Sequence, residues 1–318
     1  MAKAAPKEVQ RLDKIVSHLT GLSRQNATRL IKEGEVFVDD EAIVNAATKV
    51  NINSNIVIVG FNDDEEEQLK ASEAFKKRVF MLNKPNNFVC ADRDKNRSTV
   101  QSLFRNELNI EDLHCAGRLD VDTTGLIIVT DDGDLNHEIT SPKKSVDKVY
   151  LARLDQAVPE SAIKSFATGI KHPEEKKRYL PAKLTILDYQ DQFWAAVQLS
   201  EGRYHEVKRL FEMVGCTVQE LVRVAIGSLC LNEDQVLGAY VPLDEDEVAA
   251  LFTNHDYEQE ELIVLLERYL SHIKHSRLAY LPERYAQEAR DDMSEELSAS
   301  REEENFDELD EDGELRIY

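Results

Sequence analysis

The segment HCAGRLDVDTTGLIIVTDDGD (His114–Asp134) places three charged side chains directly before a strongly apolar run. Arg118, Asp120 and Asp122 precede Thr-Thr-Gly, and the run Leu-Ile-Ile-Val that follows has the composition of a buried strand. Charges that are buried without a partner are costly. We therefore expect these side chains to be exposed, paired with another group or placed for chemistry.

Length and charge limit the number of domains and the way the chain can contact RNA. A chain of 318 residues suggests two or more domains with ample core. The formal net charge is −22, so any contact with RNA must come from local basic patches. The segment from residue 253 to 318 holds 20 acidic and 7 basic residues, whereas residues 1–62 are close to neutral.

Several classes of protein are disfavoured by composition. No run of about 18 apolar residues exists, so we expect no membrane span. The opening MAKAAPKEVQ lacks a hydrophobic signal region, which favours the cytoplasm. The four cysteines are scattered without a CxxC pair, which argues against a zinc site and a disulfide framework.

The first 62 residues predict a small unit of two helices and a few strands. RLDKIVSHL and RQNATRLIKE have helical spacing of apolar residues, and EVFVDDEAIV reads as a hairpin that turns at Asp39-Asp40. Basic side chains follow the polar side of the helices, where an ordinary solvated face is the alternative interpretation. The charged segment from residue 63 to 77 is predicted to be a linker.

Residues 78–252 predict an α+β domain with a mainly antiparallel sheet. The expected strands are FVCA, GLIIVT, KVYLARL, AKLTILDY, QFWAAVQLS and SLCL, and the expected helices are TVQSLFRNEL, DLNHEIT, PESAIKSFATG and HEVKRLFEMVG. Residues 253–318 are expected to form an acidic extension that begins with an amphipathic helix and continues as a disordered stretch.

Three interpretations of Asp120 and Asp122 stay open from the residues alone. The first is a polar loop with a surface ion pair. The second is the D-x-D-x-T motif of magnesium-dependent phosphatases, which should follow an apolar strand of a doubly wound sheet. The third is a nucleophile toward a nucleoside, which needs an ionised carboxylate, a nearby cation and an aromatic face for the base. Lys148, Tyr150 and Lys208 are candidates for the last two groups.

The order of the sequence motifs resembles that of a known protein family. MLNKP, GRLDxDTTGL, TSP, K-x-Y and EGRYHxVKR follow one another, and R-L-D-K, S-R, a helix and G-x-V-x-V precede them. The chain resembles the RsuA-type pseudouridine synthases from Arg11 to Phe252, closest to those acting on the ribosomal small subunit, and its first 62 residues resemble an S4 RNA-binding domain.

The resemblance implies isomerisation of uridine to pseudouridine in rRNA, with uridine 516 of 16S rRNA as the expected target. It implies no cofactor and no metal. The expected partner is 16S rRNA or a small-subunit assembly intermediate, with no membrane involved, and the expected state is a monomer. A paralogue with another RNA target and a non-catalytic S4-domain assembly factor are the alternatives.

The resemblance also assigns roles by position. Asp120 corresponds to the nucleophile, Tyr150 to the tyrosine that stacks on the base and Lys208 to the basic partner of the aspartate. The residues expected to bind the substrate nucleotide are Arg118, Leu221, Arg203 and Arg209. The residues expected to bind RNA phosphates are Arg11, Lys14, Arg24, Arg29, Lys32, Lys143 and Lys144.

Two further expectations concern acidic residues. Asp122 is expected to cap or turn the Thr-Thr-Gly loop rather than to act in catalysis. Glu206 stands where the family usually has glutamine, and its charge is expected to pair with Arg203 or Arg209.

Overall fold

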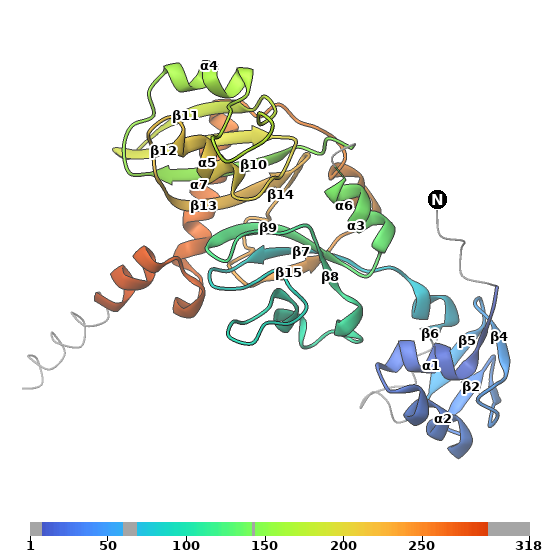
Figure 1. Cartoon of the computed structure of the whole chain (residues 1–318). Helices are drawn as coiled ribbons and strands as arrows, with labels where there is room; N and C mark the ends of the chain where they lie inside the picture. Colours follow the sequence, from blue (N-terminus) through green and yellow to red (C-terminus); the bar gives the residue numbers. More distant parts are fainter. Residues whose placement is uncertain (1–7, 60–68, 142–143, 292–318) are drawn as a thin grey trace, which may run out of the picture.

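The computed structural model describes residues 8–59, 69–141 and 144–291, and it contains a small N-terminal unit beside a larger domain (Figure 1). Lys143 and the acidic stretch from residue 292 to 318 lie outside the described residues. In the described ranges, no helix is long and apolar enough to cross a bilayer.

The N-terminal unit packs two helices on short antiparallel strands. Its elements are β1 (Val9–Arg11), α1 (Leu12–Thr20), α2 (Arg24–Glu33), β2 (Val36–Val38), β3 (Glu41–Ala42), β4 (Lys49–Asn51), β5 (Asn55–Ile58), β6 (Leu69–Lys70) and the 3₁₀ helix η1 (Ala71–Phe75). Ser23 caps α2, since its side chain accepts a hydrogen bond of 3.2 Å from the backbone N–H of Asn26. Asp39 and Asp40 have φ of 46° and 70°, which confirms the expected hairpin turn.

This unit continues further along the chain than residue 62. Strand β6 pairs with β5, and Ala71 and Ala74 of η1 are buried in the same apolar cluster as Leu12 and Ile15 of α1. We propose that the N-terminal unit runs to about Phe75, so that only the last residues of the expected linker separate it from the larger domain.

The larger domain is built on one nine-stranded sheet with the strand order β11-β12-β10-β13-β9-β7-β15, with β14 pairing with β13 and β8 with β9. The strands are β7 (Val79–Lys84), β8 (His114–Ala116), β9 (Thr123–Thr130), β10 (Lys148–Leu154), β11 (Lys183–Tyr189), β12 (Gln192–Leu199), β13 (Val218–Ile226), β14 (Leu229–Cys230) and β15 (Tyr240–Pro242). Every pairing is antiparallel except that of β9 with β13. The predicted α+β class is confirmed.

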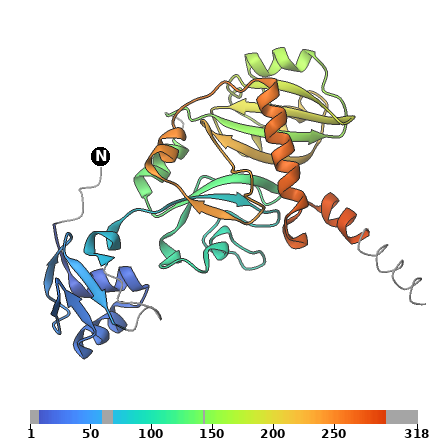
Figure 2. The ribbon, with the colours of Figure 1, turned by 180° about the vertical axis from the view of Figure 1, so that it is seen from behind.

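The helices of this domain cover both faces of the sheet (Figures 1 and 2). They are η2 (Val100–Phe104), η3 (Ile110–Asp112), α3 (Gly133–Thr140), α4 (Ser161–Thr168), α5 (Glu206–Glu212), α6 (Glu245–Ala250), α7 (Gln259–Lys274) and η4 (Leu278–Tyr280). Strand β10 shows the division, because Tyr150 and Ala152 pack with α4 and α5 whereas Val149 and Leu151 pack with α7.

Two local predictions are wrong, and a central strand was not foreseen. TVQSLFRNEL forms only the short 3₁₀ helix η2, and FVCA contributes a single bridge between Val89 and Thr99. Strand β13 was not predicted, because Glu220 and Arg223 interrupt its apolar run. The structure shows that this strand lies in the middle of the sheet.

Helix α7 was expected to open a separate extension, yet it packs on the sheet. Leu262, Leu266 and Tyr269 are buried in one cluster with Trp194 of β12, whose ring lies 6.2 Å from that of Tyr269. We propose that the larger domain continues past residue 252 and includes α7.

Candidate active site

A cavity of about 280 Å³ opens beside the loop between β8 and β9, which carries Arg118 and Asp120. Asp120 reaches it from the loop before β9, Tyr150 from β10, Leu221 from β13 and Lys208 from α5. The structure thus brings together the three residues predicted to be catalytic and one predicted to contact the base. Arg118 and Arg203 also line the cavity, whereas Arg209 does not.

Two basic side chains face the carboxylate of Asp120. Lys208 Nζ lies 3.6 Å from Asp120 Oδ2, and His205 Nε2 lies 3.4 Å from Oδ1. The side chains of Asp120 and Lys208 are 28% and 25% exposed, so solvent screens their attraction only in part.

Asp122 has a different position from the one expected. Its carboxylate oxygens accept hydrogen bonds of 2.7 and 2.8 Å from Lys208 Nζ, so that this lysine lies between two carboxylates. The turn itself is closed by the backbone, because the N–H of Thr123 donates to the carbonyl of Asp120 over 3.1 Å. Asp122 is therefore an ion-pair partner of Lys208 rather than a cap.

The phosphatase interpretation is wrong for a topological reason. Asp120 follows β8, a three-residue strand antiparallel to β9, and precedes β9. The phosphatase motif requires an aspartate at the carboxyl end of a strand in a doubly wound parallel sheet.

Paired strands form the floor of the cavity. Side chains two residues apart on a strand share a face, so Lys148 and Tyr150 of β10 lie beside Leu221 and Arg223 of β13. Tyr150 and Leu221 are only 8% and 7% exposed. A flat pyrimidine placed here would contact an aromatic ring and an aliphatic side chain.

Arg223 is a site residue that the sequence did not reveal. It is buried, its Nε donates to the carbonyl of Leu126 over 2.7 Å and its Nη1 to the hydroxyl of Tyr150 over 3.5 Å. Its Nη2 has no hydrogen-bond partner among the described residues. A charged residue within the apolar run LVRVAI was the available signal for this position.

Lys84 is a second residue that was missed. Its side chain is buried, and Nζ donates to the carbonyls of Pro85, Val121 and Thr123 over 3.1, 3.3 and 2.8 Å. Two of these carbonyls flank Asp122 in the loop that carries Asp120. Burial lowers the pKa of Lys84 to about 8. The lysine of MLNKP therefore fixes the backbone that carries Asp120.

Arg203 and Arg209 bind protein groups. Both guanidinium groups form ion pairs with Glu175, and Arg209 also pairs with Glu174 at 3.0 Å. The expected pairing of Glu206 with either side chain is wrong, because its carboxylate accepts a 2.8 Å hydrogen bond from the backbone N–H of Arg203. These contacts hold the segment around residue 175 against the start of α5.

Two ionisable groups in the cavity have shifted pKa values. Burial lowers the pKa of Lys148 to about 8, and the neighbouring charge of Arg223 acts in the same direction. Burial raises the pKa of Glu206 to about 8, and Glu201 adds to that effect. Removal from water disfavours the charged form in both cases.

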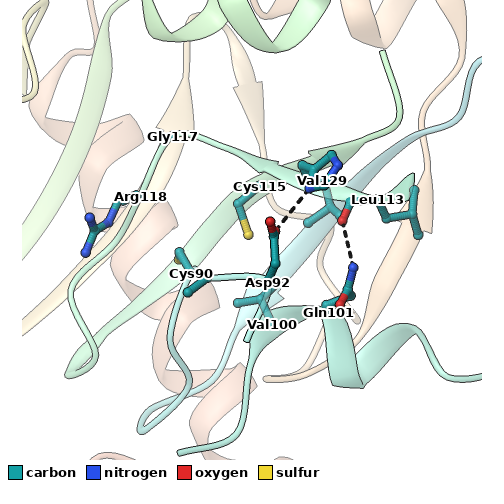
Figure 3. A pocket seen from close by; sticks show the side chains of 11 residues that line it. Cys90, Asp92, Val100, Gln101, Leu113, Cys115, Gly117, Arg118 and Val129 are labelled. Carbon is teal, nitrogen blue, oxygen red and sulfur yellow. Dashed lines mark hydrogen bonds and ion pairs between the residues drawn. The ribbon is translucent and has the colours of Figure 1, made fainter. Parts of the chain in front are cut away.

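A second cavity of about 300 Å³ shares Gly117 and Arg118 with the first (Figure 3). Cys90 and Cys115 line it, and the thiol of Cys90 accepts a hydrogen bond from the N–H of Leu119, next to Asp120. Asp92 and His114 form an ion pair of 3.0 Å at its edge. Within residues 8–59, 69–141 and 144–291, no group of three or more His, Cys, Asp or Glu side chains is arranged to hold a metal ion.

The residues predicted to bind RNA lie mostly on the surface, and several have protein partners. Arg11 and Arg24 both bind Asp13, at 2.8 and 2.6 Å, and the hydrogen bond from Arg11 is the main cause that lowers the pKa of Asp13 to about 2. The other contacts are weaker or more exposed: Lys14 lies over the ring of Phe75, Arg29 pairs with Glu33 at 3.9 Å and Lys144 with Glu138 at 3.1 Å. Lys32 is exposed on α2.

Comparisons with known proteins show which family the chain is similar to. Residues 78–213 match the family model described as RNA pseudouridylate synthase, and residues 10–56 match that of the S4 domain. The chain is 39% identical over 241 residues to a ribosomal small subunit pseudouridine synthase A of Escherichia coli (strain K12), covering 76% of this chain and 99% of the relative. A relative of the same name from Yersinia pestis is 37% identical over 245 residues, covering 77% of this chain and 99% of the relative.

A solved structure has the same fold. The crystal structure described as that of pseudouridylate synthase aligns with a TM-score of 0.52 at 37% identity, over 76% of this chain and 99% of that one. Because these relatives are covered almost completely, the chain belongs to the RNA pseudouridine synthase family, whose members are isomerases acting on RNA, and it carries an S4 domain ahead of the synthase domain.

Proposed function

We propose that this enzyme isomerises one uridine of 16S rRNA, at position 516, with Asp120 as the nucleophile. The observation that carries the proposal is the meeting of Asp120, Lys208 and Tyr150 at one cavity. The relatives named for the ribosomal small subunit support the choice of rRNA. The substrate would be free 16S rRNA or a small-subunit assembly intermediate, and the proposed place of work is the cytoplasm.

The chemistry breaks the N–C glycosidic bond of uridine, turns the uracil within the site and forms a C–C bond at C5. The hydrogen on C5 leaves as a proton and N1 gains a proton, so the overall change is an isomerisation. Asp120 supplies the carboxylate that acts on the nucleoside, and the positive charge of Lys208 lies 3.6 Å from it. Tyr150 and Leu221 hold the ring from the floor of the cavity. The reaction is a rearrangement within one nucleotide, so the proposal needs neither redox chemistry nor a transferred group.

The target nucleotide has to leave its stack before it can enter this cavity, and that step costs a few kcal/mol. Arg118 lies on the wall between the two cavities, where it can contact the flipped nucleotide. Exposed basic side chains of the S4 domain add contacts to phosphates, which position the RNA without reading its sequence. Arg203 and Arg209 hold the segment around Glu175 against the start of α5 beside the cavity.

The test is incubation of the purified protein with unmodified small-subunit rRNA or particles, followed by chemical mapping of pseudouridine. We expect modification at position 516 only. Asp120→Asn should reduce the rate at least about a thousandfold, which corresponds to about 4 kcal/mol of transition-state stabilisation. Asp122→Asn is the matched control, because it removes the neighbouring carboxylate of the same loop and should change the rate by less than about tenfold.

The results separate the alternatives. Pseudouridine at another position would identify a paralogue with a different target. RNA binding without any pseudouridine would favour the non-catalytic assembly factor. Equal rates for Asp120→Asn and Asp122→Asn would contradict the assignment of the nucleophile.

A further inference from the structure

Helix α7 lies on the face of the sheet opposite the cavity, and Figure 2 shows it crossing that face. It also lies beyond residue 213, where the match to the synthase family model ends. The helix and the turn after it nevertheless contact the strand that carries Lys84. These contacts connect the face of the sheet that α7 covers with the loop from residue 117 to 123 that carries Asp120, which we call the catalytic loop.

Strand β7 has contacts on both faces of the sheet and so links α7 to the catalytic loop. Neighbouring side chains on a strand point to opposite faces, so Lys84 points toward the catalytic loop while Asn83 points toward α7. Both side chains are fully buried. A shift of Asn83 along its face would therefore move Lys84 and the carbonyls of Val121 and Thr123 that it binds.

His272 of α7 holds Asn83 with a defined tautomer. The amide nitrogen of Asn83 lies 3.3 Å from His272 Nδ1 and 2.6 Å from the carbonyl oxygen of Gln235. His272 Nε2 lies 2.9 and 2.8 Å from the carbonyls of Asn232 and Glu233. Carbonyls only accept and the amide nitrogen only donates, so the ring carries its proton on Nε2 and accepts at Nδ1.

A second link follows the strand. The backbone N–H of Asn86 donates to the carbonyl of Tyr280 over 3.1 Å, and its side-chain amide donates to the carbonyl of Leu281 over 3.3 Å. The next residue, Asn87, donates its N–H to the carbonyl of Val121 over 2.9 Å. Adjacent residues thus bind the C-terminal segment on one side and the catalytic loop on the other.

From these contacts we propose that the C-terminal segment from residue 272 to 281 is a positioning element for the catalytic loop, with His272 as its central residue. The inference rests on the proposed role of Asp120. His272 acts through Asn83 and Lys84 and does not touch the substrate. Its effect should therefore fall on the chemical step rather than on RNA affinity.

Two conservative variants separate this role from simple packing. His272→Asn places an acceptor near the position of Nδ1 and keeps the bond from Asn83, whereas His272→Gln places a donor near Nε2 and keeps only the bonds to Asn232 and Glu233. Leu262→Ala is the control for lost stability, because Leu262 is buried on the same helix about 15 Å away from His272 along its axis.

The full-length variants are compared below their unfolding temperatures, by kcat and KM with rRNA and by hydrogen exchange at the amides of Asn87 and Thr123. We expect His272→Gln to lower kcat about tenfold with unchanged KM and to speed exchange at both amides. His272→Asn and Leu262→Ala should stay within about twofold of the wild-type kcat.

Equal kcat and equal exchange for His272→Gln and His272→Asn would overturn the inference. So would a loss of kcat in Leu262→Ala as large as that in His272→Gln. An inactive wild-type protein would count against the proposed function instead, and the exchange measurement would then decide the positioning role alone.

Discussion

Glu206 is a carboxylic acid in a place where removal from water makes its charge unfavourable. Burial raises its pKa from the ordinary value near 4.5 to about 8. The folded state therefore binds its proton more tightly than the unfolded state. This contribution to stability is complete below pH 4.5 and is lost as the pH rises to about 8.

Glu206→Gln should remove that dependence. We expect the variant to gain stability relative to the wild type as the pH is raised from 5 to 8, because glutamine has no proton to lose. Thermal unfolding at pH 5, 6, 7 and 8 measures the difference in Tm. Glu212→Gln is a suitable control, since Glu212 ends the same helix with an exposed side chain. A constant difference in Tm across this range would contradict the shifted pKa.

Cys90 gives a second prediction at the level of one side chain. A hydrogen bond from Cys115 is the main cause that lowers the pKa of Cys90, and the N–H of Leu119 acts in the same direction. The pKa values of Cys115, Cys216 and Cys230 are raised instead. Only thiolates react readily with alkylating agents.

Iodoacetamide at pH 7 should therefore modify Cys90 first, and the added group should lower activity because it displaces the contact to Leu119. Peptide mass mapping over time identifies the order of labelling. Cys90→Ser should resist the inactivation. Faster labelling of any other cysteine would show that the contact with Cys115 does not favour the thiolate.

The residues that meet at the cavity differ in how readily the sequence predicts them. Asp120, Tyr150 and Lys208 could be predicted, because a motif order fixed their positions and the chemistry required a carboxylate, a ring and a cation. Arg223 and Lys84 could not, because their contacts form only after distant strands have paired. Each binds backbone carbonyls, and a sequence does not show which carbonyls will lie nearby.

At the scale of elements, the parallel contact between β9 and β13 decides the geometry of the site. It sets Leu221 beside Thr123 and Arg223 beside Gly125. Short, mostly antiparallel strands were predictable from alternating apolar residues, whereas this pairing joins segments almost 100 residues apart. The charged residues Glu220 and Arg223 also obscured β13 as a strand, although the buried Arg223 lines the cavity floor.

Gly125 allows that close contact. A Cβ atom at this position would lie 2.2 Å from the carbonyl oxygen of Arg223, and φ of Gly125 is +101°, a conformation that other residues rarely adopt. We expect Gly125→Ala to destabilise the domain by more than about 2 kcal/mol through strain and the displaced strand. Gly133→Ala is the control, because nothing lies within 4 Å of its added Cβ. Urea unfolding measures both, and equal midpoints would contradict the close approach.

At the scale of the whole molecule, the S4 domain and the synthase domain have separate cores. Contacts between described residues that join them include a hydrogen bond of 3.2 Å from the side-chain amide of Asn109 to the carbonyl of His18, and Leu108 lies against Gly21. The net charge of −22 belongs to the whole chain and opposes RNA binding, so we expect the basic helix face of the S4 domain to provide local attraction. Changes on that face should alter affinity without altering chemistry.

Lys32→Glu tests whether the helix face acts on RNA affinity alone, since Lys32 is exposed on α2 and far along the chain from Asp120. We expect a higher KM for rRNA, a dependence of log affinity on log salt that is shallower by about one unit for each lost phosphate contact, and an unchanged kcat at saturating RNA. Lys49→Glu makes the same change of charge on β4 of the same domain and should leave the salt dependence unaltered. If both variants weaken binding equally, RNA responds only to the overall charge of the domain, and the helix face has no special role in recognition.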